Sequence, residues 1–256
     1  MTSDPSYLRR SDGATIAYDV VAPASMSLPG VVFLHGLMSD RNGTKALALA
    51  DHCRRKGYGC VRFDMFGHGV SSGRFEDGTI SRWTADTIAV LDELTQGPQI
   101  LVGSSMGGWV MVRTALARAA RIAGMVGIAV APDFTDDMMA RELTAAQRSE
   151  LASKGIVHVQ SDYETGPYPI TRNFVDDGRR NFVLTGPVAV SCPVRLLHGQ
   201  RDTVVPYQKS LSLAEKMSGD NVHILLIKDG DHRLSRPQDL AQLCGALDDV
   251  ISQVRI

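Results

Sequence analysis

The sequence predicts an α/β fold with a mostly parallel sheet and helices on both faces. Short apolar runs rich in β-branched residues alternate along the chain with segments whose apolar residues have helical spacing. The chain has 256 residues, of which 44% are hydrophobic, and this is enough to bury a substantial core. We find no internal repeat and no low-complexity tract, so we expect a single domain over residues 1–256.

The apolar runs are short, which is typical of strands that are buried on both faces of a sheet. The expected strands are Ile16 to Val21, Gly30 to Leu34, Cys60 to Phe63, Ile100 to Val102, Met125 to Ala131, Val194 to Leu197 and Val222 to Ile227. The expected helices between and after them are Thr44 to Lys56, Arg82 to Leu94, Met106 to Arg118, Gln208 to Met217 and Leu240 to Val254. This alternation indicates βαβ crossovers.

One interval, residues 133–187, interrupts the alternation. It is more polar than the rest, with a helix-like piece around Met138 to Lys154 followed by a loop rich in Tyr, Pro, Gly and Asn. We expect a small inserted lid over the edge of the sheet. The alternative is a surface excursion without contact to substrate, because long insertions cost little free energy.

Charge and composition exclude several classes of partner. The 27 basic and 28 acidic residues leave a net charge of −1 without a basic run, which argues against nucleic-acid binding. No apolar stretch of about 18 residues is present, so we expect no membrane span. The polar segment Met1 to Arg10 resembles neither a signal peptide nor a transit peptide, which predicts a cytoplasmic, plausibly bacterial, location.

The cysteines suggest reduced thiols. They are far apart and form no C-x-x-C pair, so neither a zinc site nor a redox motif is indicated: Cys53, Cys60, Cys192 and Cys244. We therefore expect no metal and no cofactor. Composition does not indicate an oligomeric state.

Ser105 has the sequence context of a catalytic nucleophile. The expected strand Ile100 to Val102 leads directly into Gly103-Ser104-Ser105-Met106-Gly107-Gly108, after which helical spacing resumes. A serine on such a strand-to-helix turn is a nucleophile elbow, in which side chains two positions before and after it would collide with neighbouring backbone. The alternatives are an anion-binding helix start and a packing turn. A phosphate loop is disfavoured because no Lys-Ser/Thr pair follows the glycines.

A nucleophilic serine needs a neutral imidazole as base, itself oriented by a carboxylate. In the last third of the chain, His232 lies in a loop just after an expected strand, at the sheet edge where ligands bind in open α/β sheets. His223 lies inside that strand, and we expect it on a solvated face. His198 precedes the best acid candidate. His232 is therefore the predicted base.

The predicted acid is Asp202, in the loop that follows the expected strand Val194 to Leu197. Asp133, just after the strand that ends at Ala131, is the rival position, although it opens the predicted lid. Asp231 is expected to be a turn residue. Ser105, His232 and Asp202 together predict a serine hydrolase.

Acyl transfer also needs N–H donors aimed at the developing oxyanion. The amide of Met106, directly after the nucleophile, is one candidate. The second is the amide of Leu37, because Gly36 allows the backbone after the strand to approach closely. We expect His35 to be a buried histidine bonded to neighbouring loops, whose loss costs stability more than chemistry.

Aromatic residues are candidates for the walls of the substrate pocket. Trp109 follows the elbow and is expected beneath the site. The candidates for the rim are Tyr163, Tyr168 and Tyr207.

These motifs match a known superfamily. They resemble those of the α/β-hydrolases over essentially the whole chain: His35-Gly36, Gly103-x-Ser105-x-Gly107, His198-Gly199-x-x-Asp202-x-x-Val205-Pro206 and Gly230-Asp231-His232. Further segments are similar to a mammalian family of mitochondrial palmitoyl-protein thioesterases and acyl-glucuronide esterases: Arg62-Phe63-Asp64, residues 97–105, Gly107-Gly108-Trp109 and residues 192–199.

The resemblance implies an α/β-hydrolase fold and a cofactor-free deacylase for carboxylic esters or thioesters. It implies a small-molecule or acylated substrate and the same three residues, Ser105, Asp202 and His232. Two alternatives stay open: a non-catalytic ligand-binding protein on the same fold, and a perhydrolase or haloperoxidase-like activity that uses peroxide in place of water.

Overall fold

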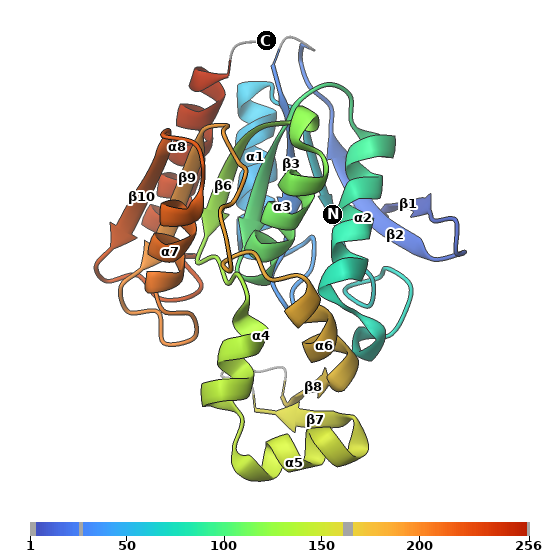
Figure 1. The fold of residues 1–256 in the computed structure, drawn as a ribbon. Coiled ribbons are helices and arrows are strands. Elements are labelled where there is room, and N and C mark those ends of the chain that lie inside the picture. The colour runs from blue at the N-terminus through green and yellow to red at the C-terminus, as the bar shows by residue number, and fades with distance from the viewer. Residues whose placement is uncertain (1–3, 26–27, 161–165, 255–256) are drawn as a thin grey trace.

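An eight-stranded, mostly parallel sheet forms the centre of the computed structural model, which describes residues 4–25, 28–160 and 166–254 (Figure 1). The strand order is β1-β2-β4-β3-β5-β6-β9-β10, and only the pairings of β1 with β2 and of β2 with β4 are antiparallel. The strands are β1 Ser6–Arg9, β2 Thr15–Val21, β3 Gly30–Leu34, β4 Cys60–Phe63, β5 Gln99–Ser104, β6 Ile122–Ile128, β9 Val194–Gly199 and β10 Val222–Ile227. The predicted α/β-hydrolase fold is therefore confirmed.

Helices cover both faces of this sheet, as β3 illustrates. Val31 and Phe33 of β3 belong to one buried cluster, with α1 and α8, whereas Val32 and Leu34 belong to the other, with α2, α3 and α7. Alternate side chains of a strand point to opposite faces, so an uninterrupted apolar run is required when both faces are buried. The helices are α1 Thr44–Lys56, α2 Ile80–Leu94, α3 Met106–Ala117, α7 Gln208–Lys216 and α8 Pro237–Gln253.

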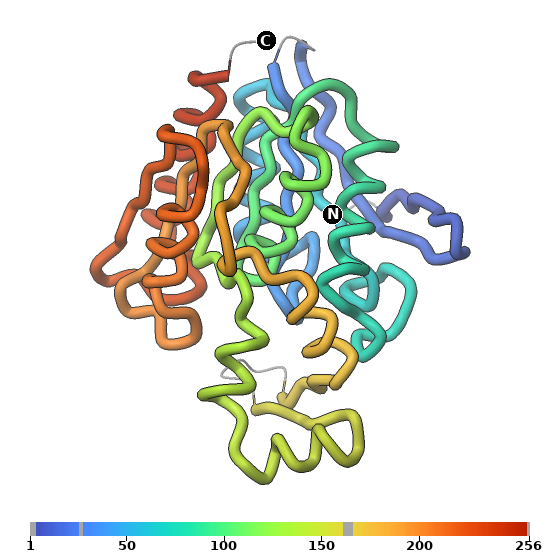
Figure 2. Tube along the Cα trace, in the orientation of Figure 1, coloured from blue at the N-terminus to red at the C-terminus, as the bar shows by residue number. Residues whose placement is uncertain are grey.

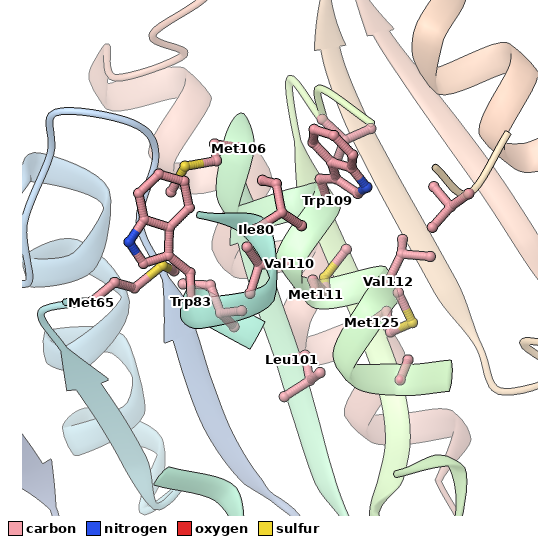
Figure 3. Close-up of a cluster of buried hydrophobic side chains, with 14 of the residues drawn as sticks. Met65, Ile80, Trp83, Leu101, Met106, Trp109, Val110, Met111, Val112 and Met125 are labelled. Carbon is pink, nitrogen blue, oxygen red and sulfur yellow. The ribbon is translucent and has the colours of Figure 1, made fainter. Parts of the chain in front are cut away.

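The larger cluster lies between the sheet and α2 and α3. Trp83 of α2 and Met111 of α3 are fully buried in it, beside Leu101 of β5 (Figure 3). Burying one such side chain stabilises the fold by roughly 1.5–3 kcal/mol. The helix that follows the elbow is thus fixed by packing along most of its length.

Residues 133–187, which we call the insertion, extend beyond the carboxyl ends of the central strands (Figures 1 and 2). The insertion contains α4 Phe134–Asp137, the π-helix Met138–Glu142, α5 Ala145–Lys154, the antiparallel pair β7 Ile156–Val159 and β8 Tyr168–Thr171, and α6 Arg172–Arg180. The predicted helix over residues 138–154 is interrupted, because Thr144 starts α5 with a capping box that it forms with Gln147.

Several boundaries differ from prediction for local reasons. The strand expected over Met125 to Ala131 is β6, Ile122–Ile128, which ends where Ala129 adopts a φ of 46°. The segment expected as an irregular loop after residue 154 contains β7, β8 and α6. Thr171 caps the N-terminus of α6, because its hydroxyl accepts a hydrogen bond from the Phe174 amide.

Candidate active site

Ser105 occupies a tight turn between β5 and α3. Its φ of 54° and ψ of −120° are unfavourable for a residue with a side chain. Neighbouring backbone forces this conformation: a Cβ at position 103 would lie 2.5 Å from the Gly107 carbonyl oxygen, and one at position 107 would lie 2.3 Å from that of Leu34. Only glycine fits at these two positions, so the turn has the geometry expected of a nucleophile elbow.

The structure brings Ser105, His232 and Asp202 together from three loops at the same sheet edge. His232 Nε2 lies 3.1 Å from Ser105 Oγ, and His232 Nδ1 lies 2.7 Å from Asp202 Oδ2. Because the carboxylate accepts from Nδ1, Nε2 of the neutral ring is left to accept the serine proton. These are the contacts that a serine nucleophile, its base and an orienting acid require.

Asp202 is held by more groups than the sequence predicted. Its Oδ1 accepts hydrogen bonds from the amides of Val204 and Val205, and its Oδ2 also accepts one from His198 Nε2 at 3.1 Å. Burial opposes ionisation of this fully buried carboxyl, but hydrogen bonds from His198, His232 and the backbone outweigh burial and hold its pKa well below the usual range. Asp202 is therefore a carboxylate at neutral pH.

His198 is the residue that sequence reasoning missed. It is fully buried, and its Nε2 also faces the Val205 carbonyl oxygen at 2.9 Å, which requires Nε2 to carry a proton. Its Nδ1 contacts the hydroxyl of Ser210 at 2.7 Å. Its position at the end of an expected strand, four residues before Asp202, could have predicted this contact from the sequence.

The loop after β3 lies directly beside Ser105. A Cβ at Gly36 would lie 3.3 Å from the Cβ of Ser105, a tight contact that favours glycine at this approach. In the described part of the chain, neither the Leu37 nor the Met106 amide donates to a protein acceptor. A pocket of about 340 Å³ opens here, lined among others by Leu37, Lys45, Ser105, His232 and Arg233.

His35 is buried, and its contacts are those expected of a histidine that links two loops. Its Nε2 accepts the Met65 amide at 3.0 Å, and its Nδ1 contacts the Gly36 carbonyl oxygen at 2.8 Å. Burial lowers its pKa to about 4, so the ring is neutral at physiological pH.

The rival residues have other surroundings. Asp133 accepts hydrogen bonds from the amides of Val183 and Leu184 at the other end of the insertion. Burial raises its pKa, against the effect of these bonds. Asp231 accepts the Leu234 amide as a turn residue, and His223 is exposed on β10.

The two rim candidates that the structure describes, Tyr168 and Tyr207, do not line the pocket beside Ser105. Trp109 is fully buried, donates from Nε1 to the Asn181 carbonyl oxygen at 3.0 Å, and packs against rings of the insertion. Trp109 does not line that pocket either. Tyr163 lies outside the described residues.

Two further properties concern metals and membranes. Over residues 4–25, 28–160 and 166–254, the His, Cys, Asp and Glu side chains form no group of three or more that could hold a metal ion. No helix within these ranges has the length and apolar character needed to cross a membrane.

Fold and sequence together define the class of protein. Residues 31–243 match the model of the alpha/beta hydrolase family, and the chain belongs to that family. Its homologues include named thioesterases and esterases.

Particular relatives match nearly the whole chain. It is 37% identical to the human palmitoyl-protein thioesterase ABHD10, mitochondrial, over 97% of this chain and 80% of that protein. The structure of mouse alpha/beta hydrolase domain-containing protein 10 superposes with a TM-score of 0.89 at 36% identity, covering 98% of this chain and 99% of that one. A putative hydrolase from Agrobacterium vitis superposes with a TM-score of 0.92 at 43% identity, covering 97% and 98%.

These comparisons correct one prediction. The ABHD10 relatives are named as mitochondrial proteins, which contradicts the predicted cytoplasmic location. The prediction was based on the N-terminal residues and on free cysteines, and the cysteines are indeed unpaired in the structure. Reduced thiols do not distinguish the cytoplasm from the mitochondrial interior, so they could not support that conclusion.

Proposed function

We propose that this protein is a serine hydrolase that deacylates carboxylic esters or thioesters through an acyl-enzyme. The observation that carries the proposal is the unbroken hydrogen-bonded chain from Ser105 Oγ through His232 to Asp202, with distances of 3.1 and 2.7 Å. It ends at a serine in a strained turn that opens into a pocket. Strain and a relay of this kind are characteristic of nucleophilic catalysis.

The first step forms the acyl-enzyme. Ser105 Oγ attacks the acyl carbonyl carbon while His232 Nε2 takes the hydroxyl proton, and the resulting imidazolium is stabilised by the buried Asp202 carboxylate. The carbonyl oxygen becomes an oxyanion, which accepts hydrogen bonds from the Leu37 and Met106 amides. As the tetrahedral intermediate collapses, His232 returns its proton to the leaving alkoxide or thiolate.

The second step releases the acid. His232 removes a proton from water, the hydroxide attacks the acyl carbon, and the oxyanion forms again at the same two amides. Collapse breaks the bond to Ser105 Oγ, which regains its proton from His232. Charge and protons balance within the three residues, so no metal or redox group takes part in the proposed steps.

The acylated substrate is suggested by the relatives. ABHD10 is named a palmitoyl-protein thioesterase, and we extend to this chain the wider class of acyl esters and thioesters. We also propose that the insertion acts as a lid that selects the acyl group. Asp133 joins the two ends of the insertion, and the salt bridge of Lys209 with Asp137 links the insertion to α7.

A fluorophosphonate probe tests the proposal, because it phosphonylates an activated serine with loss of fluoride. Intact mass should show one adduct on the wild type, one on the control Ser104→Ala, and none on Ser105→Ala or His232→Ala. Ser104 is the adjacent buried serine and makes the control specific. An unlabelled wild type that binds acyl ligands stoichiometrically without turnover would replace the proposal by the ligand-binding alternative.

A further inference from the structure

Two buried histidines form hydrogen bonds to the backbone of the turn beside the nucleophile. The turn comprises residues 36–39, with the Ser39 amide donating to the Gly36 carbonyl oxygen at 3.2 Å. Met38, its third residue, has a φ of 57°, as in a type II turn, in which glycine is favoured at that position. A methionine in this conformation is strained and requires support from its surroundings.

His35 supports the first peptide group of the turn. Its Nε2 faces the Met65 amide, which can only donate, so Nε2 is unprotonated and the proton is on Nδ1. Nδ1–H therefore donates to the Gly36 carbonyl oxygen, at 2.8 Å. That carbonyl and the Leu37 N–H belong to the same planar trans peptide, so fixing one fixes the direction of the other.

His68 supports the next peptide group. The Met38 amide donates to His68 Nε2 at 3.3 Å, and His68 Nδ1 faces the Phe66 carbonyl oxygen at 3.2 Å. The ring of His68 lies 4.8 Å from that of His35 and is enclosed by the edges of Phe75 and Trp83. Both peptide groups that flank Leu37 are thus held by imidazoles that have little freedom to move.

The peptide that is held so firmly has a free donor. In the described residues, the Leu37 amide has no acceptor, although it lies in the pocket with Ser105. A hydrogen bond to the carbonyl of a peptide also polarises its N–H and strengthens that donor. The histidines therefore act on the peptide group whose N–H is the expected oxyanion donor.

We propose that His35 and His68 are positioning residues that orient the Leu37 amide, and that His35 also polarises it, so that it donates to the oxyanion of the acyl-transfer reaction. This inference depends on the proposed serine hydrolase function. It adds a specific role to two side chains that are otherwise links between loops.

Two isosteric substitutions at His35 separate positioning from structural support. His35→Asn keeps a donor at the place of Nδ1 and loses the acceptor for Met65. His35→Gln keeps an acceptor at the place of Nε2 and loses the donor to Gly36. Because loss of a whole oxyanion donor costs 10²–10³ in kcat, we expect a loss of about 30-fold for His35→Gln and only about 3-fold for His35→Asn, with KM little changed in both.

Binding of an alkylboronic acid gives a second readout, because it forms a tetrahedral adduct on the serine that resembles the intermediate. Its affinity should fall in His35→Gln by the same factor as kcat, whereas the affinity for the product carboxylic acid should not. Urea unfolding midpoints of both variants show whether the difference in their kcat losses follows a difference in stability instead.

The outcomes are distinct. An active wild type with equal kcat losses in the two variants, or with losses that follow their stability, would refute the positioning role and leave the hydrolase proposal intact. A wild type without Ser105-dependent turnover would overturn both. If the His35 variants do not fold, the same comparison is made with His68→Gln, which keeps an acceptor for Met38, and His68→Leu, which should lose more kcat.

Discussion

Replacing Asp202 by asparagine exchanges one acceptor oxygen for an NH₂ donor with almost no change in shape. In the wild type, Oδ1 accepts from two backbone amides, at 2.9 and 2.7 Å, whereas Oδ2 accepts from His232 and His198. The amide oxygen of asparagine should take the Oδ1 position, because the opposite orientation would direct NH₂ against both backbone donors. The new NH₂ then faces the two imidazoles.

The magnitude follows from this orientation. His232 Nδ1 must become an acceptor, which moves its proton to Nε2 and removes the base that faces Ser105. Loss of the correct tautomer in a triad of this kind lowers kcat by about 10⁴, or roughly 5.4 kcal/mol in the activation free energy. His198 Nε2 also loses one of its two acceptors but keeps the Val205 carbonyl oxygen, so we expect about 0.5–1.5 kcal/mol of lost stability.

Hydrolysis of a p-nitrophenyl ester at pH 7.5, with urea unfolding of the same samples, measures both quantities. Asp231→Asn is the matched control, because Asp231 is adjacent to His232 in sequence but only accepts the Leu234 amide. It should keep its activity within about twofold, as ordinary surface substitutions do. If Asp202→Asn retained more than a tenth of wild-type kcat while folded, the assigned tautomer and the role of Asp202 would be wrong.

Three further predictions concern stability. Burial lowers the pKa of His35 to about 4 and that of His68 to about 3, so both rings stay neutral in the native state at pH values where unfolded histidine, with a pKa near 6.5, is already protonated. Their contribution to the free energy of unfolding is therefore complete above pH 6.5 and is lost as the pH falls toward 4. For His35 this pH-dependent contribution is on the order of 3 kcal/mol. Because His35→Gln lacks it, the urea midpoint of this variant should fall less steeply between pH 7.5 and 5 than that of the wild type. Gly103→Ala should cost at least about 2 kcal/mol because its Cβ would meet the Gly107 carbonyl oxygen, whereas Gly186→Ala, with open space around it, should change the midpoint little; equal effects would contradict the elbow argument. Asp133→Ala should cost about 2 kcal/mol and speed proteolytic cleavage within the insertion, because a buried amide and a partly buried one lose their acceptor. An unchanged digestion pattern would count against this anchor.

The fold and the meeting of the three site residues could be predicted because they depend on local rules. The glycines two residues on either side of Ser105 are dictated by the elbow, because a Cβ on Gly103 would meet the Gly107 carbonyl oxygen and one on Gly107 would meet that of Leu34 in the neighbouring strand. Asp202 and His232 follow neighbouring parallel strands, β9 and β10, whose carboxyl ends lie at the same edge. The central strands could also be predicted, because strands buried on both faces of a sheet appear in the sequence as continuous apolar runs.

Other features depend on contacts between distant segments, which leave little trace in sequence. His68 meets Met38 across 30 residues, and Asp133 meets Val183 across 50. The elements β7, β8 and α6 of the insertion have only 4, 4 and 9 residues, too few to establish the period that identifies an element. The predicted rim tyrosines were chosen by residue type alone, which does not specify where a ring points.

The hydrogen bonds of Asp133 have a consequence for how this family can diversify. Because the two ends of the insertion meet at one side chain, only a short distance separates the end of β6 from the segment that leads to β9, although α6 of the insertion also packs on the core. A different excursion could be grafted between residues 133 and 183 at a small entropic cost, which grows only slowly with its length. Selection could thereby exchange the segment that we propose as a lid and leave Ser105, His232 and Asp202 where they are.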